Sequence, residues 1–238
     1  MTLFLNGGGC GEQVKESYAL LKQKVDTNKP LLYIPLAMEK EKYPSCLEWI
    51  SGELADFYFP KIDMITSAEE LCAKNLAHYA ALFIGGGNTY KLLAELKSCN
   101  AFSKINAFLE QGGIVFGGSA GAILFGKTID SCRHADPNEV GLKKTSGFNK
   151  VFGAYIGAHY PNDDPAKTQR ATECFTELSN DVPVIALPEE DTLLMNQNTI
   201  QIVGSKPYHL FKDGSVHQLE PNQIYFTQEF RKFILSSE

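Results

Sequence analysis

The segment 117–121 places a serine between small residues. It reads Gly-Gly-Ser-Ala-Gly, follows the apolar run 114–116 and precedes the apolar residues 122–124. This order predicts a buried strand that turns sharply into a helix, with Ser119 at the turn. Glycines are needed there because a Cβ beside the strained serine backbone would collide with its neighbours. The pattern is typical of a nucleophile, and the Ala120 amide at the helix N-terminus favours nearby negative charge.

A second glycine-rich turn, 85–89, follows the apolar run 82–84 and precedes a helical pattern. In an open parallel sheet, ligands gather at the carboxyl ends of the strands, where both turns would lie. Glycine frees backbone amides to point at an oxyanion. We therefore expect the amides of Gly87 and Ala120 to form an oxyanion hole, and we expect Asn88 to bind substrate.

Nucleotide binding is the alternative function for these glycine-rich turns. The lysine of a P-loop is missing from both the 85–89 turn and the N-terminal cluster 7–11. The N-terminal cluster also has Glu12 where the dinucleotide-binding pattern requires its third glycine. Cys10, within that cluster, lies in a flexible turn that does not favour a nucleophile.

A serine nucleophile needs a neighbouring base, and the chain contains five histidines. His159 follows the run 152–158, which places it at a strand end on the side of the sheet where Ser119 is expected. We therefore predict that His159 is the general base. The other four histidines lie in settings that favour this role less: His78, His134, His209 and His217.

The imidazole in turn needs a carboxylate to fix its tautomer. The apolar run 184–188 leads directly into Glu189, Glu190 and Asp191, and the residues alone leave the choice among these three open. The chain order serine, histidine, acid differs from the order serine, acid, histidine of the α/β-hydrolases, which argues against that fold.

Four segments together resemble the peptidase E family of serine peptidases, whose fold is similar to that of class I glutamine amidotransferases: 84–89, 117–122, 158–160 and 185–189. The resemblance extends over about residues 3–210. It implies that Ser119 is the nucleophile, His159 the base and Glu189 the acid, with Gly87 and Ala120 in the oxyanion hole. It implies no cofactor and no metal ion. Some members use an aspartate shortly after the nucleophile helix, for which the nearest counterpart is Asp130.

One departure from the family pattern concerns the substrate. Peptidase E is an aspartyl dipeptidase, and its pattern places an arginine directly after a threonine to hold the aspartyl carboxylate. Here Thr168 is followed by Gln169, and Arg170 comes one place later, so Gln169 and Arg170 are the substrate-binding candidates of this segment. One residue along a helix corresponds to a rotation of about 100°, so Arg170 is expected to project elsewhere. Loss of a charged partner predicts weak or absent Asp-Xaa preference and cleavage after a neutral first residue.

The elements that must position these residues alternate along the chain. The apolar runs 3–5, 31–35, 82–84, 114–116 and 182–187 are separated by helical patterns, such as those at 14–25 and 165–178. This alternation predicts an α/β fold with a mostly parallel central sheet and helices on both faces. After about residue 190, short strands with turns at 196–198 and 213–214 predict a C-terminal β meander that extends the sheet. No linker is visible, so one domain, 1–238, is expected.

The charge and the apolar patterning of the chain limit the classes of binding partner that we expect. The formal net charge is −6 and the lysines are scattered, so no nucleic acid partner is expected. No membrane partner is expected either, because no apolar run approaches the length of a membrane span and the N-terminus lacks a signal-peptide pattern. We therefore expect a cytoplasmic protein. The six cysteines form no C-x-x-C pair, which argues against a zinc site and a disulfide framework.

These observations predict a serine peptidase that hydrolyses short peptides near their amino end through an acyl-enzyme. A cyanophycinase-like peptidase is one alternative, and it would need a larger and more acidic groove for a branched aspartyl-arginine polymer. A non-catalytic binding or sensor domain of the same fold is the other. The sequence leaves the oligomeric state open, with a homodimer as one expectation.

Overall fold

The computed structural model describes residues 1–236 and contains two β-sheets. The order of the eight-stranded sheet is β12 (Ile224–Phe226), β9 (Thr199–Val203), β8 (Thr192–Met195), β1 (Thr2–Asn6), β5 (Ile114–Gly118), β4 (Leu82–Ile84), β2 (Leu31–Ile34) and β3 (Ile62–Met64). The order of the four-stranded sheet is β11 (Ser215–Leu219), β10 (Tyr208–Lys212), β7 (Val184–Pro188) and β6 (Tyr155–Tyr160).

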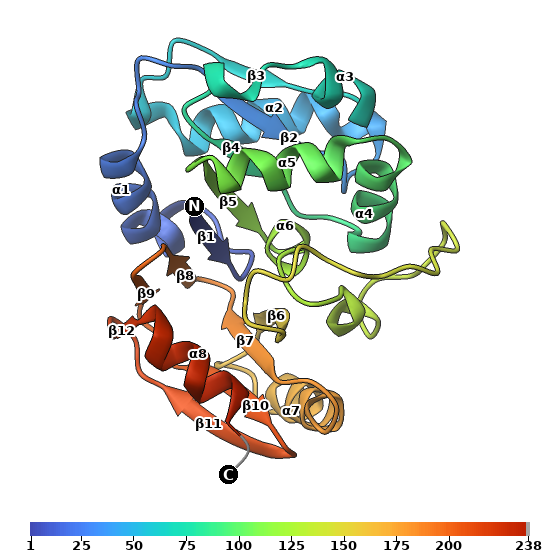
Figure 1. Cartoon of the computed structure of the whole chain (residues 1–238), viewed down its shortest axis with the longest axis vertical. Coiled ribbons are helices and arrows are strands. Elements are labelled where there is room, and N and C mark those ends of the chain that lie inside the picture. Colours follow the sequence, from blue (N-terminus) through green and yellow to red (C-terminus); the bar gives the residue numbers. More distant parts are fainter. Residues whose placement is uncertain (237–238) are drawn as a thin grey trace.

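Helices cover both faces of the parallel part of the larger sheet (Figure 1). Strands β1, β5, β4, β2 and β3 pair in parallel, and the apolar runs of the first four suit burial on both faces. One face packs against α1 (Lys15–Lys24) and α2 (Tyr43–Glu53). The other packs against α3 (Ala68–Ala73), α4 (Thr89–Ser98) and α5 (Ala101–Glu110). The predicted α/β fold is confirmed.

The C-terminal strands are antiparallel, as expected, but they divide between the two sheets. Strands β8, β9 and β12 extend the larger sheet. Strands β10 and β11 form a hairpin that pairs with β7 in the smaller sheet, so this part of the expected extension is wrong. The physical reason is that β10 can pair with the edge of β7 and bury its apolar residues in the same two cores. Leu210 packs with Ile185 on one face of the smaller sheet, and Phe211 packs with Val184 on the other.

The smaller sheet has apolar residues on both faces. One face packs against α7 (Pro165–Ser179) through Phe175, Leu178 and Phe211. The opposite face, with Ile185 and Leu210, joins the same core as β1, and the terminal helix α8 (Thr227–Leu235) packs there (Figure 1). Among residues 1–236, no helix has the length and apolar character needed to cross a membrane.

Candidate active site

Ser119 lies in the sharp turn between β5 and the short helix α6 (Ala120–Ile123). Its φ of 52° and ψ of −114° are rare for a residue with a side chain, so the surrounding structure must hold this strained backbone. Glycine is required on both sides. A Cβ on Gly117 would lie 2.5 Å from the Gly121 carbonyl oxygen, and a Cβ on Gly121 would overlap the Ile84 carbonyl. The turn therefore has the geometry expected of a nucleophile elbow.

His159 lies beside Ser119, with its Nε2 2.7 Å from Ser119 Oγ. The register of β6 against β7 shifts between Gly157 and Tyr160, and His159 within this irregular stretch has a φ of 55°. Irregularities of this kind re-aim a side chain out of a regular sheet. The distance allows a hydrogen bond in which the serine hydroxyl donates and the imidazole accepts.

Glu189 is the acid that the structure brings to the imidazole. Its Oε1 lies 3.6 Å from His159 Nδ1, within reach of an ion pair when the imidazole is charged. Glu190 instead faces Lys206, at 3.9 Å, and buried Asp191 accepts hydrogen bonds from the backbone of residues 205 and 206. Of the three acids that the sequence left open, Glu189 is therefore placed for the role.

Asp130 lies away from the His159 imidazole. It belongs to the short 3-10 helix Asp130–Cys132, where its Oδ2 accepts a hydrogen bond from Thr128 Oγ1 at 2.7 Å. Within residues 1–236, no ion pair joins Asp130 to His159. The structure therefore favours Glu189 over Asp130, the counterpart that some family members imply, because the Asp130 carboxylate hydrogen bonds within its own loop.

The backbone amides of Gly87 and Ala120, both near Ser119, have no acceptor among residues 1–236. Gly87 has a φ of 130°, and a Cβ there would lie 2.5 Å from the Ala37 carbonyl oxygen, so only glycine fits. A Cβ on Gly86 would approach the Ser119 side chain to 3.1 Å. The 85–89 turn thus runs close to the serine, and the Gly87 amide of this turn and the Ala120 amide of α6 are available for an oxyanion.

A cavity of about 750 Å³ opens in front of Ser119 and His159. One helical face of α7 lines it, formed by residues spaced at i, i+3, i+4 and i+7: Lys167, Arg170, Ala171 and Cys174. The loop after α6 contributes Asp136, which accepts hydrogen bonds from both the N–H and the hydroxyl of Thr89. The cavity therefore combines a nucleophile, two imidazoles, the Asp136 carboxylate and two cationic side chains.

The expectation that Arg170 projects away from the site is wrong. Arg170 lines the Ser119 cavity, whereas Gln169 donates a hydrogen bond to Glu173, at 2.9 Å, among exposed groups. The cause is the orientation of α7, which is set by Phe175 and Leu178 packing on the smaller sheet. This packing turns the helical face that contains Arg170 toward Ser119.

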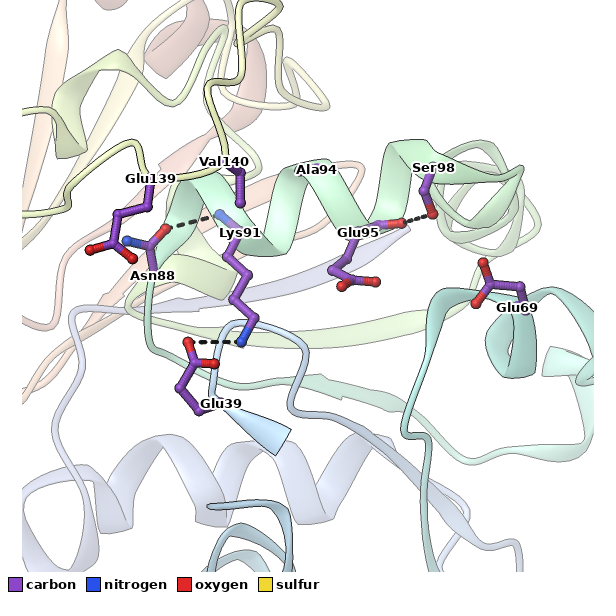
Figure 2. A pocket seen from close by; sticks show the side chains of 9 residues that line it. All are labelled: Glu39, Glu69, Asn88, Lys91, Ala94, Glu95, Ser98, Glu139 and Val140. Atoms are coloured by element: carbon purple, nitrogen blue, oxygen red, sulfur yellow. Dashed lines mark hydrogen bonds and ion pairs between the residues drawn. The ribbon is translucent and has the colours of Figure 1, made fainter. Parts of the chain in front are cut away.

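Asn88 makes structural hydrogen bonds at the start of α4. Its Oδ1 accepts a hydrogen bond from the Lys91 amide and caps α4, and its Nδ2 donates to the Pro137 carbonyl. Figure 2 shows the separate pocket of about 590 Å³ that Asn88 lines together with Lys91 and Glu39. Gly87 and Thr89 line the Ser119 cavity and Asn88 does not, so substrate binding by Asn88 stays a prediction.

Two further features of the site escaped sequence reasoning. The N-terminal turn 7–9 lies against the site, and a Cβ on Gly8 would overlap the His159 ring. The signal was available, because this turn, like the other two glycine-rich turns, follows an apolar strand. His134 lines the cavity with its ring edge-on to Phe175, and burial lowers the pKa of its imidazole.

The sequence matches a known family over most of its length. The model of peptidase family S51 matches residues 3–203. A peptidase E from Shewanella putrefaciens is 32% identical over 229 residues, which cover 92% of this chain and 94% of the relative. A peptidase E from Nostoc sp. is 26% identical over 213 residues, which cover 87% of this chain and 84% of the relative.

Two solved structures share the fold. A peptidase from an acI-B1 actinobacterium aligns with a TM-score of 0.70 at 18% identity, over 94% of this chain and 96% of the other. A structure from Listeria monocytogenes aligns with a TM-score of 0.68 at 20% identity, over 86% of this chain and 98% of the other.

Proposed function

Because the chain belongs to peptidase family S51 and is a serine peptidase, we propose that it hydrolyses dipeptides and other short peptides through an acyl-enzyme on Ser119. The observation that carries the proposal is the 2.7 Å contact between Ser119 Oγ and His159 Nε2 at the edge of a cavity. A hydroxyl paired with an imidazole in this way is the arrangement that activates serine for attack on a carbonyl.

The proposed reaction uses five groups. His159 Nε2 takes the hydroxyl proton as Ser119 Oγ attacks the peptide carbonyl, and the Gly87 and Ala120 amides hold the resulting oxyanion. Glu189 stabilises the imidazolium through Nδ1. His159 then protonates the leaving amine, which departs and leaves an ester on Ser119. Water, deprotonated by His159, hydrolyses this ester and restores the hydroxyl.

The size and charge of the cavity support a short, acidic substrate. A volume of about 750 Å³ is within the range of small-ligand pockets. The prediction of a neutral first residue depended on an Arg170 that projects elsewhere, and it loses its basis once Arg170 lines the cavity. We therefore propose that an acidic side chain at the first residue is accepted by Arg170, with Lys167 nearby.

The same cations weigh against the cyanophycinase-like alternative. A polymer that carries arginine side chains would need an acidic groove, whereas Lys167 and Arg170 line this cavity. The non-catalytic alternative makes a different prediction. A binding domain would not need a strained serine in contact with an imidazole, and it would not react with a fluorophosphonate.

The test compares Ser119→Ala with Ser103→Ala, which removes an exposed hydroxyl from α5. We expect the unmodified protein and Ser103→Ala to hydrolyse dipeptides and to gain one fluorophosphonate adduct. Ser119→Ala should lose the adduct and at least about 10³-fold of the turnover, because removal of a triad nucleophile leaves little catalysis. Turnover that survives in Ser119→Ala would contradict the mechanism, and an unmodified protein without adduct or turnover would favour a binding domain.

A further inference from the structure

We propose that Asn6 is a positioning residue, whose side-chain amide holds His159 and Glu189 in their reacting arrangement with Ser119. This inference rests on the function proposed above. It concerns the last residue of β1, which lies between β5 and β8 in the larger sheet and touches neither the cavity nor the reacting atoms.

The Asn6 side chain is buried, with 1% of its surface exposed, and all of its hydrogen-bonding groups are used. Its Nδ2 donates to the Asp191 carbonyl at 3.0 Å and to Thr192 Oγ1 at 3.1 Å. Its Oδ1 accepts from the Gly8 amide at 2.8 Å. A buried group with such partners has no water to replace them, so removal of the amide leaves the partners unsatisfied.

The contact with Gly8 leads to the general base. The His159 ring lies directly over the Cα of Gly8, where a Cβ would overlap it, and the His159 amide donates to the Gly7 carbonyl at 2.9 Å. The imidazole itself is 49% exposed, so few side chains pack around it. The turn 7–9, which the Asn6 side chain holds through the Gly8 amide, is therefore the surface against which the imidazole packs.

The contact with Asp191 leads to the acid. The Asp191 carbonyl also accepts from the Gly7 amide at 3.0 Å, and the Gly9 amide donates to the Glu189 carbonyl at 2.5 Å. The segment that bears the Glu189 carboxylate is thus bonded to the turn at both ends. Asn6 contributes the side-chain bonds at one end and fixes the turn that makes the others.

Ser119 completes the set through the backbone of the same residue. Its amide donates to the Asn6 carbonyl at 3.0 Å. Any residue at position 6 would keep this backbone bond, so a substitution of Asn6 should spare the elbow and misplace the imidazole and the carboxylate relative to it. Misplacement of a catalytic group by about 1 Å costs roughly 10²-fold in rate.

The chain offers a control in Asn196, which follows β8 and lies near the start of β1, to which β8 is antiparallel, whereas Asn6 lies at the end of β1. Its Oδ1 accepts a hydrogen bond from the Asn198 amide at 2.8 Å, just as the Asn6 Oδ1 accepts one from the Gly8 amide. Its Nδ2 donates to Thr199 Oγ1, as that of Asn6 does to Thr192 Oγ1. Asn196→Ala therefore removes similar bonds from a similar turn without contact with the site.

The experiment measures both the rate and the final stoichiometry of Ser119 labelling by a fluorophosphonate, together with kcat and KM for a dipeptide. We expect Asn6→Ala to slow labelling and lower kcat about 100-fold. KM should change less than about threefold, and the endpoint should remain one adduct per chain. Asn196→Ala should label at the unmodified rate, although its melting temperature falls as well.

An unchanged labelling rate in Asn6→Ala would overturn the inference, and so would equal slowing in Asn196→Ala. A lower endpoint in Asn6→Ala with an unchanged rate would also overturn it, because it would mean that the substitution only produces a misfolded fraction. If the unmodified protein is not labelled, the proposed function fails instead. If Asn6→Ala does not fold, Asn6→Asp keeps an acceptor for the Gly8 amide and removes the donation to the Asp191 carbonyl and to Thr192 Oγ1. It should slow labelling, and an unchanged labelling rate in this variant would overturn the inference as well.

Discussion

Arg170 stands one place later in the sequence than the arginine of the family pattern, yet its side chain still lines the Ser119 cavity. Within residues 1–236 it makes no ion pair, so its guanidinium is available to a ligand of the Ser119 cavity. Lys167, on the same helical face, is 3.5 Å from Asp164 and thus partly neutralised. At this scale, Arg170 rather than Lys167 is the residue expected to set the charge preference of the substrate.

We predict that Arg170→Gln lowers turnover of Asp-Xaa dipeptides about 10- to 100-fold and leaves Leu-Xaa turnover nearly unchanged, because one charge-assisted hydrogen bond is lost. Gln169→Ala is the control, since this neighbour points to Glu173 on the exposed side of α7. A dipeptide panel with Asp, Leu, Met and Arg at the first position measures the ratio. If Arg170→Gln leaves the Asp-to-Leu ratio unchanged, Arg170 does not read the first side chain.

The turn between β7 and β8 couples stability to pH. Burial raises the pKa of Asp191 from its ordinary value of 3.8 to about 6, although the amides of Lys206 and Ser205 hydrogen bond its carboxylate and oppose this effect. From about pH 4 to pH 6, the folded chain therefore keeps a proton that the unfolded chain releases. The contribution of Asp191 to the free energy of unfolding accordingly falls as the pH rises through this window.

We predict that Asp191→Asn removes this part of the pH dependence. Melting temperatures of the unmodified protein and the variant should diverge between about pH 4 and pH 6, with the unmodified protein losing more stability as the pH rises. The asparagine of this variant would offer one carbonyl oxygen where the Asp191 carboxylate offers two oxygens to the amides of Ser205 and Lys206, so the variant loses stability at every pH. The readout is therefore the change in melting temperature across the pH window and not its value at a single pH. Parallel curves across the window would contradict a proton held at Asp191.

The elements that sequence patterns predict well are those with strong apolar periodicity. Strands β1, β2, β4 and β5 and the Ser119 elbow fall where the apolar runs place them, since a strand buried on both faces needs such a run. The half-buried edge strand β3, whose central residue is Asp63, was not predicted. The direction in which α7 turns Arg170 was not predictable, because it depends on packing against a sheet formed by distant segments. The irregular register that aims His159 leaves no local signal either.

At the scale of the whole molecule, the two sheets share one core. Leu3 and Leu5 of β1 belong to the same buried cluster as Ile185 of β7 and Leu210 of β10. Separate unfolding of either sheet would expose the apolar face that it shares with the other. The single domain 1–238 remains a prediction, as does the homodimer.

We predict one cooperative thermal transition, in which tryptophan fluorescence from Trp49 near β2 and far-ultraviolet circular dichroism report the same midpoint. The shared core makes this the expected result despite the length of the chain. Calorimetry should give matching calorimetric and van't Hoff enthalpies. Two resolved transitions would mean that the sheets unfold as separate units.

The most direct test of the central claim, that Ser119 forms a covalent acyl intermediate, is mass spectrometry of the protein quenched with acid during turnover of an aminoacyl ester. We predict that the Ser119 peptide carries the aminoacyl mass at steady state, and that the mass disappears once the substrate is exhausted. Rapid consumption of the ester with Ser119 unmodified at every quench time would contradict the account.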